Sequence, residues 1–139
     1  MANEAVLQVG LRIQKGNLSY QSLPQSFTAT VTGSKGPTPG AITVTTAGVN
    51  VDLSGLTTPG LCRLMNLDST NVVEWGVHDG SIFHPVGEML PGESYVIRFS
   101  RNLLEEEDVP GTGTTADINA FMLRAVGGSC ICLVECFET

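Results

Sequence analysis

The turn signals between residues 60 and 100 constrain the fold more than any other feature of the sequence. Three gaps separate apolar, strand-length runs there: Asp68-Ser69-Thr70-Asn71, Asp79-Gly80 and Pro91-Gly92. Asp-Gly predicts a hairpin, because both residues tolerate the positive φ of a type I′ turn. Pro-Gly predicts a type II turn, because Pro presets φ and Gly accepts the left-handed position. The segment therefore predicts an antiparallel meander, and it carries no obvious set of catalytic residues.

Alternation of apolar and polar residues extends the β prediction toward both ends of the chain. Leu7, Val9, Leu11 and Ile13 share one face of a strand over residues 6–14. Residues 26–32 have the pattern of a half-buried strand. Further strands are predicted near residues 41–46 and 49–53, which are expected to pair, and near 73–77, 95–99, 118–126 and 129–137. Gly127-Gly128 predicts a hairpin link between the last two.

Other segments are predicted to be loops that connect the strands. Residues 34–40 hold two prolines and two glycines and predict a loop. Residues 101–109 are the one passable helix candidate, but their acidic run and the lack of a capping glycine favour a helical turn or loop. The whole pattern predicts an all-β, antiparallel β-sandwich, jelly-roll-like, with about eight to ten short strands. At 139 residues the chain fits a single domain, 1–139.

The charge of the chain limits the classes of partner that it can bind. The formal net charge is −7, and only seven basic residues are scattered along the sequence. Nucleic acids require clustered Lys and Arg, so we predict no nucleic-acid partner. No secretory signal is visible at the N-terminus. The longest nearly apolar stretch, residues 125–134, has roughly half the length needed to span a bilayer. We therefore expect a protein made in a cytoplasm, with no membrane partner and with reduced cysteines.

Two histidines and a glutamate form a possible metal-binding group. His78, His84 and Glu88 have the spacing H-x5-H-x3-E, and a metal site needs about three converging ligands. The H-x-H pair of cupins is absent, and His78 abuts the Asp79-Gly80 turn. We interpret both histidines as exposed loop residues and predict no metal and no cofactor. A cupin-like metal enzyme is the third-ranked hypothesis.

The cysteines near the C-terminus are interpreted as buried side chains. Cys130, Cys132 and Cys136 would lie on the same face of a regular strand, where a C-x-C spacing keeps the sulfur atoms apart. Metal-binding thiolates usually come in C-x-x-C knuckles. Small buried hydrophobic residues are the favoured reading, and exposure of these thiols to a neighbouring subunit is the alternative.

No catalytic residues are predicted. The sequence has two histidines and no G-x-S-x-G nucleophile elbow, and residues 111–115 are not followed by the Gly-Lys-Ser/Thr of a phosphate loop. Residues Glu105, Glu106, Glu107 and Asp108 lack the ordered alternation of a calcium loop. They are expected to form a solvated loop that could contact a basic partner. Trp75, in phase with Val73 and Val77, is expected in the core.

Part of the sequence resembles a known family of proteins. The segment Leu64-Met65-Asn66-Leu67-Asp68-Ser69-Thr70-Asn71, then Val73-Glu74-Trp75-Gly76-Val77, then Phe83, Pro85 and Leu90-Pro91-Gly92-Glu93 resembles small β-sandwich virion proteins of tailed bacteriophages. Those proteins often carry N-L-D-x-T-N, a hydrophobic residue and E-x-G, followed by an aromatic strand and L-x-P-G-E. About 40 of the 139 residues take part. His84 and the cysteine-rich final strand depart from the family pattern.

The resemblance implies a function in the virus particle. It implies a jelly-roll or related sandwich that acts as a capsid decoration (cement) protein, often a homotrimer, bound to the major capsid protein on the capsid exterior. It carries over no catalytic residues. A tail- or fibre-associated carbohydrate-binding module is the alternative, with Trp75, Tyr95 or Tyr20 stacking on sugar rings.

Candidate contact residues follow from the sequence pattern. We predict that the N-terminal strand, residues 5–14, forms an intersubunit arm, because an apolar, regularly alternating terminal segment can pair with a neighbour as an added strand. The predicted intersubunit or capsid contacts are Leu7, Val9, Leu11, Glu105, Glu106, Glu107 and Asp108.

Overall fold

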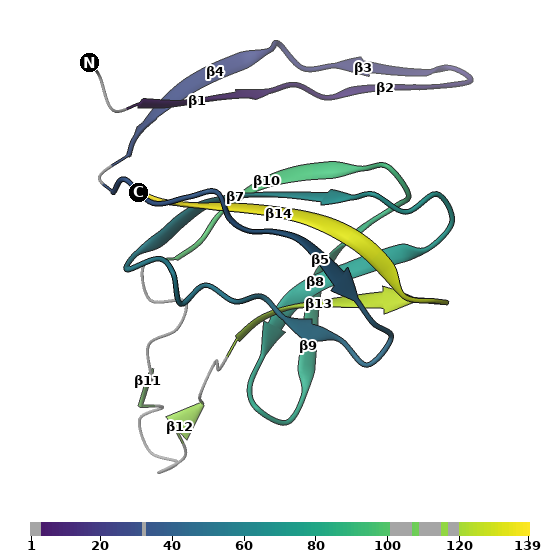
Figure 1. Ribbon diagram of the computed structural model, residues 1–139. Helices are drawn as coiled ribbons and strands as arrows, with labels where there is room; N and C mark the ends of the chain where they lie inside the picture. Colours follow the sequence, from purple (N-terminus) through teal and green to yellow (C-terminus); the bar gives the residue numbers. More distant parts are fainter. Residues whose placement is uncertain (1–3, 32, 101–106, 109–114, 117–119) are drawn as a thin grey trace.

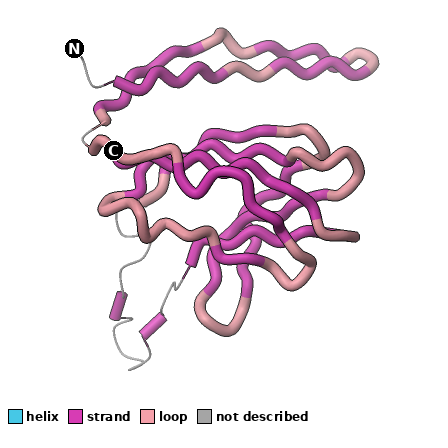
Figure 2. The backbone as a smooth tube through the Cα atoms, viewed as in Figure 1, coloured by secondary structure: helices cyan, strands magenta, loops and turns pink. Residues whose placement is uncertain are grey.

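The described part of the chain is an antiparallel β-sandwich (Figures 1 and 2). The computed structural model describes residues 4–31, 33–100, 107–108, 115–116 and 120–139, and it has no helix among them. The first sheet has the order β10 (Ser94–Arg98), β7 (Pro59–Asn66), β14 (Cys130–Glu138) and β5 (Thr38–Val44). The second has the order β6 (Val49–Asn50), β13 (Ala120–Val126), β8 (Val72–His78) and β9 (Phe83–Met89). The predicted fold class is confirmed.

The core lies between these two sheets. β14 pairs with β7 and β5 within the first sheet, and its buried positions alternate, so that Cys130, Cys132, Val134 and Cys136 face the core between the sheets. The second sheet contributes Val73, Phe121 and Leu123, and the Phe121 ring meets Phe99 edge-on at 5.0 Å between centroids. Trp75, predicted in the core, is partly buried and packs against this cluster from its edge.

The predicted meander at residues 60–100 is wrong in its pairing. Only β8 and β9 pair as neighbours in the chain, whereas β7 and β10 belong to the other sheet, where they pair with each other. The chain therefore crosses between the sheets at residues 67–71 and again at 90–93. Turn residues specify a local reversal but not a pairing partner. β7 and β8 face the same core from opposite sides. Placing them in two sheets therefore buries more apolar surface than pairing them side by side in one sheet would.

Two further predicted pairings are also crossings between the sheets. β13 and β14 are joined at Gly127-Gly128, yet β13 pairs with β8 and β6, and β14 pairs with β7 and β5. The predicted hairpin is therefore an arch, with Gly127 at φ +97°. β5 and β6 are likewise in different sheets. The predicted loop at 34–40 ends earlier than expected, because β5 begins at Thr38. Pro39 is tolerated there because β5 is an edge strand.

The N-terminal residues form a long two-stranded ribbon outside the sandwich (Figure 1). β1 (Glu4–Val9) pairs with β4 (Gln25–Thr30), and β2 (Arg12–Lys15) pairs with β3 (Leu18–Gln21). The turn at Gly16-Asn17 has Gly16 at φ +55°, as a two-residue hairpin turn of type II′ requires. We call residues 4–30 the ribbon. Figures 1 and 2 show it lying along the outer face of the first sheet.

An extra residue interrupts the ribbon near its middle. Residues 10–11 on one strand face residues 22–24 on the other, which is a β-bulge between the two ladders. Leu11 keeps the strands together there, because its N–H donates to Ser22 Oγ and its carbonyl accepts from Ser22 N–H, both at 2.8 Å. Since the extra residue is on the second strand, the alternation of residues 4–15 continues unbroken.

The remaining described pieces are short. β11 (Glu107–Asp108) pairs with β12 (Thr115–Ala116). The predicted helical turn at 101–109 otherwise lies outside the described residues, as do Glu105 and Glu106. Across the ranges that the structure describes, no helix is long and apolar enough to cross a membrane.

Candidate functional site

The two motifs that carry the family resemblance meet at one end of the sandwich. Asn66, which is fully buried, joins them. Its backbone N–H donates to the Glu93 carbonyl at 2.9 Å, and its carbonyl accepts from Gly92 N–H at 3.1 Å. Its side-chain Nδ2 donates to the carbonyls of Asn71 at 2.8 Å and Met89 at 3.2 Å. Asn66 therefore holds both crossings between the sheets in one hydrogen-bonded unit.

Each crossing is also fixed by a carboxylate of its own. Asp68 Oδ1 accepts from the N–H groups of Thr70 and Asn71, both at 2.7 Å, and these bonds lower the pKa of Asp68. Glu93 Oε2 accepts from Leu90 N–H at 2.8 Å, across the Pro91-Gly92 turn. The Glu93 N–H donates to the Leu90 carbonyl at 3.0 Å and Gly92 has φ +78°, which confirms the predicted type II turn. The N-L-D-x-T-N and L-P-G-E residues thus have structural roles.

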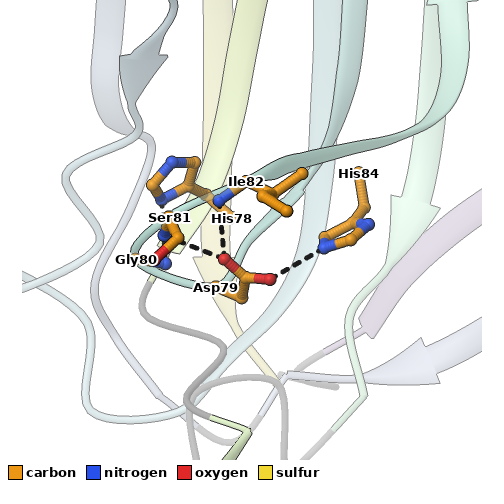
Figure 3. Close-up of polar contacts among 6 residues, drawn as sticks. All are labelled: His78, Asp79, Gly80, Ser81, Ile82 and His84. Carbon is orange, nitrogen blue, oxygen red and sulfur yellow. Dashed lines mark hydrogen bonds and ion pairs between the residues drawn. The ribbon is translucent and has the colours of Figure 1, made fainter.

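Figure 3 shows the loop between β8 and β9, residues 79–82, which we call the histidine loop because a histidine flanks it on each side. The prediction that both histidines are exposed loop residues is wrong, because His78 ends β8 and is partly buried, and His84 lies in β9. Asp79 Oδ1 accepts from the N–H groups of Ser81 at 2.8 Å and Ile82 at 2.7 Å, and Asp79 Oδ2 pairs with His84 Nε2 at 2.9 Å. The hydrogen bond to His84 is the largest cause, and the two backbone bonds the next, of a pKa of Asp79 far below its usual value. The predicted hairpin is confirmed, but as a four-residue loop in which Asp79 lacks the positive φ of a type I′ turn.

The structure does not bring His78, His84 and Glu88 together as a metal site. His78 Nδ1 accepts the Gly80 N–H at 3.1 Å, and His84 is engaged by Asp79. Glu88 lies opposite Glu74 in the β8–β9 ladder, and Glu74 pairs with Arg124 at 2.6 Å. Within the described ranges, no three His, Cys, Asp or Glu side chains are arranged to hold a metal ion. The histidine loop acts as a hydrogen-bonded hairpin cap.

The cysteines are buried, as predicted for the final strand, but two of them are paired. Cys62 of β7 lies directly opposite Cys136 of β14, and the two form a disulfide with 4.0 Å between their Cα atoms. The expectation that all the thiols are reduced is therefore wrong for this pair. Cys130 and Cys132 are free and buried, and burial raises the pKa of Cys132 to about 12. Such thiols are protonated near neutral pH and are poor nucleophiles.

The ribbon presents the largest set of exposed apolar side chains in the described structure. Its register places apolar residues opposite one another on a single face, as in Leu7 with Phe27 and Ile13 with Tyr20. We define the apolar face of the ribbon by the residues Leu7, Val9, Leu11, Ile13, Leu18, Tyr20, Phe27 and Ala29; the polar residues Lys15 and Gln25 lie on the same face, opposite Leu18 and Val9. Of these only Ala29 is buried, and Val9, Leu11 and Leu18 each expose more than half of their surface. The opposite face is mainly Gln, Ser and Thr.

The base of the ribbon contacts the outer face of the first sheet. Leu7 and Phe27 line a cavity of about 290 Å³ together with Leu61, Val96 and Phe137 of that sheet. The sheet face beneath is also apolar and open, with Ile131 52% and Val96 56% exposed. Arg63 and Glu135, its central charged pair, neutralise each other at 2.7 Å. Two incompletely covered apolar surfaces therefore lie next to each other.

The predicted contact residues have different surroundings. Leu7 is half-buried at the base of the ribbon, whereas Val9 and Leu11 are exposed on the apolar face. Glu105 and Glu106 lie outside the described residues, and Glu107 and Asp108 form β11, of whose side chains nothing is described. Sequence reasoning missed the second half of the ribbon, Leu18 and Tyr20, although the Gly16-Asn17 dipeptide between alternating runs is a hairpin signal.

No protein-family model, no curated protein and no solved structure matches the chain. Its function is therefore inferred from its residues and their geometry.

Proposed function

We propose that this chain is a non-enzymatic bacteriophage structural protein, a capsid decoration (cement) protein that binds and stabilises the assembled major capsid shell. One observation supports the proposal most. The two motifs of the family resemblance, which begin 24 residues apart at Asn66 and Leu90, are joined through Asn66 by hydrogen bonds at one end of the sandwich. They form a single structural unit, so their joint occurrence has a physical reason beyond separate turn chemistry. The step from shared structure to shared role is an analogy between families.

The exposed ribbon is in keeping with an assembling protein. Soluble monomers rarely expose a large contiguous apolar patch, and such patches mark interaction surfaces. The acidic remainder of the molecule keeps free copies apart in solution and suits a basic contact surface on a shell. The proposal assigns the protein to the capsid exterior after synthesis in the host cytoplasm, with the major capsid protein and further copies of this chain as partners.

A binding experiment with shells tests this function. Purified protein is mixed with undecorated heads and, separately, with free capsid subunits, and each mixture is sedimented. We expect saturable, stoichiometric co-sedimentation with assembled shells, none with free subunits, and a higher melting temperature of the decorated shell. If the protein stays in the supernatant when the heads are sedimented, the decoration role is refuted. Antibody label on intact particles from the source gives an independent outcome, since label confined to the tail would favour the tail or fibre role.

The alternative, a carbohydrate-binding tail module, loses its strongest aromatic residue. Trp75 packs against the core, and a Cβ at Gly87 would lie 2.6 Å from its ring, so that face is closed by β9. Tyr20 and Tyr95 remain exposed by 53% and 41%. Glycan titration monitored by tyrosine signals in NMR spectra tests this alternative, and unchanged spectra at saturating glycan would exclude it.

A further inference from the structure

We propose that the apolar face of the ribbon is a self-association surface, which is covered by the same face of the ribbon in a second copy of this chain. The proposal goes beyond the decoration role, because it names the surface through which copies join and holds whether or not the oligomer binds a shell.

The base of the ribbon is held in place by its linker, which is fastened to the end of β14. Glu138 N–H donates to the Lys35 carbonyl at 3.3 Å, and the Lys35 ammonium lies 4.0 Å from the Glu138 carboxylate. Gly33 and Gly36 sit so close to Glu138 and Phe137 that a side chain on either would overlap them. With its base fixed in this way, the ribbon leaves the distal part of its apolar face exposed, and a second copy of the ribbon can cover it.

The distribution of charge also favours contact between the ribbons of two copies. The ribbon contains Glu4, Arg12 and Lys15, a net charge of +1, so the rest of the chain carries −8. Two copies repel each other through their acidic bodies but not through their ribbons. The basic residues Arg12 and Lys15 lie toward the turn, whereas Glu4 lies at the base. In an antiparallel arrangement, the turn of one ribbon approaches the base of the other and its acidic body, which is electrostatically favourable.

The apolar face also has the composition of the centre of an interface. Its exposed side chains are mainly large and apolar, whereas most of the Gln, Ser and Thr side chains of the ribbon lie on the opposite face. Tyr20 and Phe27, about half exposed, supply the aromatic side chains that dominate interface energies. A contact of the same patch on both copies is isologous, so the symmetry it generates is twofold.

Two neighbouring residues on opposite faces of β2 give a matched pair of variants. Ile13→Asp places a charge on the apolar face, and Gln14→Asp places the same charge on the polar face. Oligomer mass is measured by light scattering over a concentration series. We expect wild type and Gln14→Asp to form dimers or multiples of dimers, and Ile13→Asp to raise the dissociation constant roughly tenfold or more.

The outcomes decide the proposal. A wild type that is monomeric throughout the series overturns it, as does an oligomer that Ile13→Asp leaves unchanged. Identical far-ultraviolet circular dichroism of both variants controls for folding. A second measurement does not depend on destabilising the contact. Leu11→Cys lies near the middle of the ribbon, where a twofold axis brings the two copies of a residue together, and with a short bis-maleimide it should give a covalent dimer. Wild type should not, because Cys130 and Cys132 are buried. A Leu11→Cys protein that cross-links no better than wild type contradicts the interface. Oligomers that form normally but do not bind heads would refute the decoration role alone.

Discussion

Asn66 is the residue on which the end of the sandwich most depends. It is fully buried, and its side chain both donates to the carbonyls of Asn71 and Met89 and accepts the Asp68 N–H at 3.0 Å. Asn66→Ala removes these bonds and leaves buried polar groups without partners, so we expect a loss of about 2–4 kcal/mol in the free energy of unfolding. Urea denaturation measures it. Asn50→Ala, at an exposed strand position, should change stability by less than about 0.5 kcal/mol; equal losses in the two variants would contradict the role of Asn66.

Gly87 is required by the Trp75 ring. A Cβ at Gly87 would lie 2.6 to 2.9 Å from three ring atoms, closer than packed atoms approach. Gly87→Ala should therefore destabilise the protein by about 1–3 kcal/mol and change the fluorescence of the single tryptophan. The control is Gly10→Ala, where the nearest atom to the new Cβ is 3.9 Å away. A Gly87→Ala protein with wild-type melting temperature and emission would show that the ring moves without cost.

Asp79 gives the histidine loop a definite acid response. The pKa of this carboxyl is lowered in the folded protein, first by the hydrogen bond with His84 and then by the Ile82 and Ser81 N–H groups. A lowered folded pKa contributes stability that is present above the unfolded value near 3.8 and is lost as the pH falls toward the folded pKa. Carboxyl NMR titration should show Asp79 still ionised at pH values where free aspartate is protonated. His84→Ala should move its midpoint upward, and an unmoved midpoint would assign the shift to the backbone bonds alone.

At the scale of elements, the ribbon and the sandwich are separable. The buried core cluster contains no residue of the ribbon, and the ribbon's own apolar face is largely exposed. Deleting residues 2–30 should therefore leave a sandwich that unfolds cooperatively, with its melting temperature lowered by only a few degrees, as about 1 kcal/mol would produce. Calorimetry measures this. A truncated chain without a cooperative transition would mean that the base of the ribbon is part of the folding unit.

The elements also show what a sequence pattern specifies. Strand positions followed from alternation and turn residues, since both depend on neighbours close in the chain. Pairing did not: Gly127-Gly128 and the Asp68–Asn71 gap permit either a hairpin or an arch, and the choice is set by burial on the far side of the core. The Trp75 position was predictable because Val73 and Val77 share its face. The Cys62–Cys136 pair was not, because the register of β7 on β14 is set by contacts 74 residues apart.

At the scale of the whole molecule, the disulfide joins the two central strands of the first sheet. Cys62 and Cys136 are separated by 74 residues, and in the chain-entropy account a closed loop of that length stabilises a protein by about 4 kcal/mol. The double variant Cys62→Ala with Cys136→Ala should lose stability of that order in urea denaturation under non-reducing conditions, whereas Cys130→Ala alone should retain the cross-link. Alkylation at pH 8 counts the reactive cysteines. We expect no modified cysteine in the native protein, two after unfolding without reductant, and four after unfolding and reduction. Four modified cysteines without reductant would show that the pair is not oxidised.

The connection between the ribbon and this disulfide determines how a force on the ribbon is transmitted to the sandwich. The ribbon continues directly into β5 and its linker is fastened to Glu138, while β5 lies beside β14 along its length and β14 is covalently joined to β7. A pulling force on the ribbon enters the first sheet at β5, its edge strand, and passes to β14 through the β5–β14 ladder. The Cys62–Cys136 disulfide then keeps the two central strands together under load, so the sheet would part between β5 and β14 before it parts at its centre.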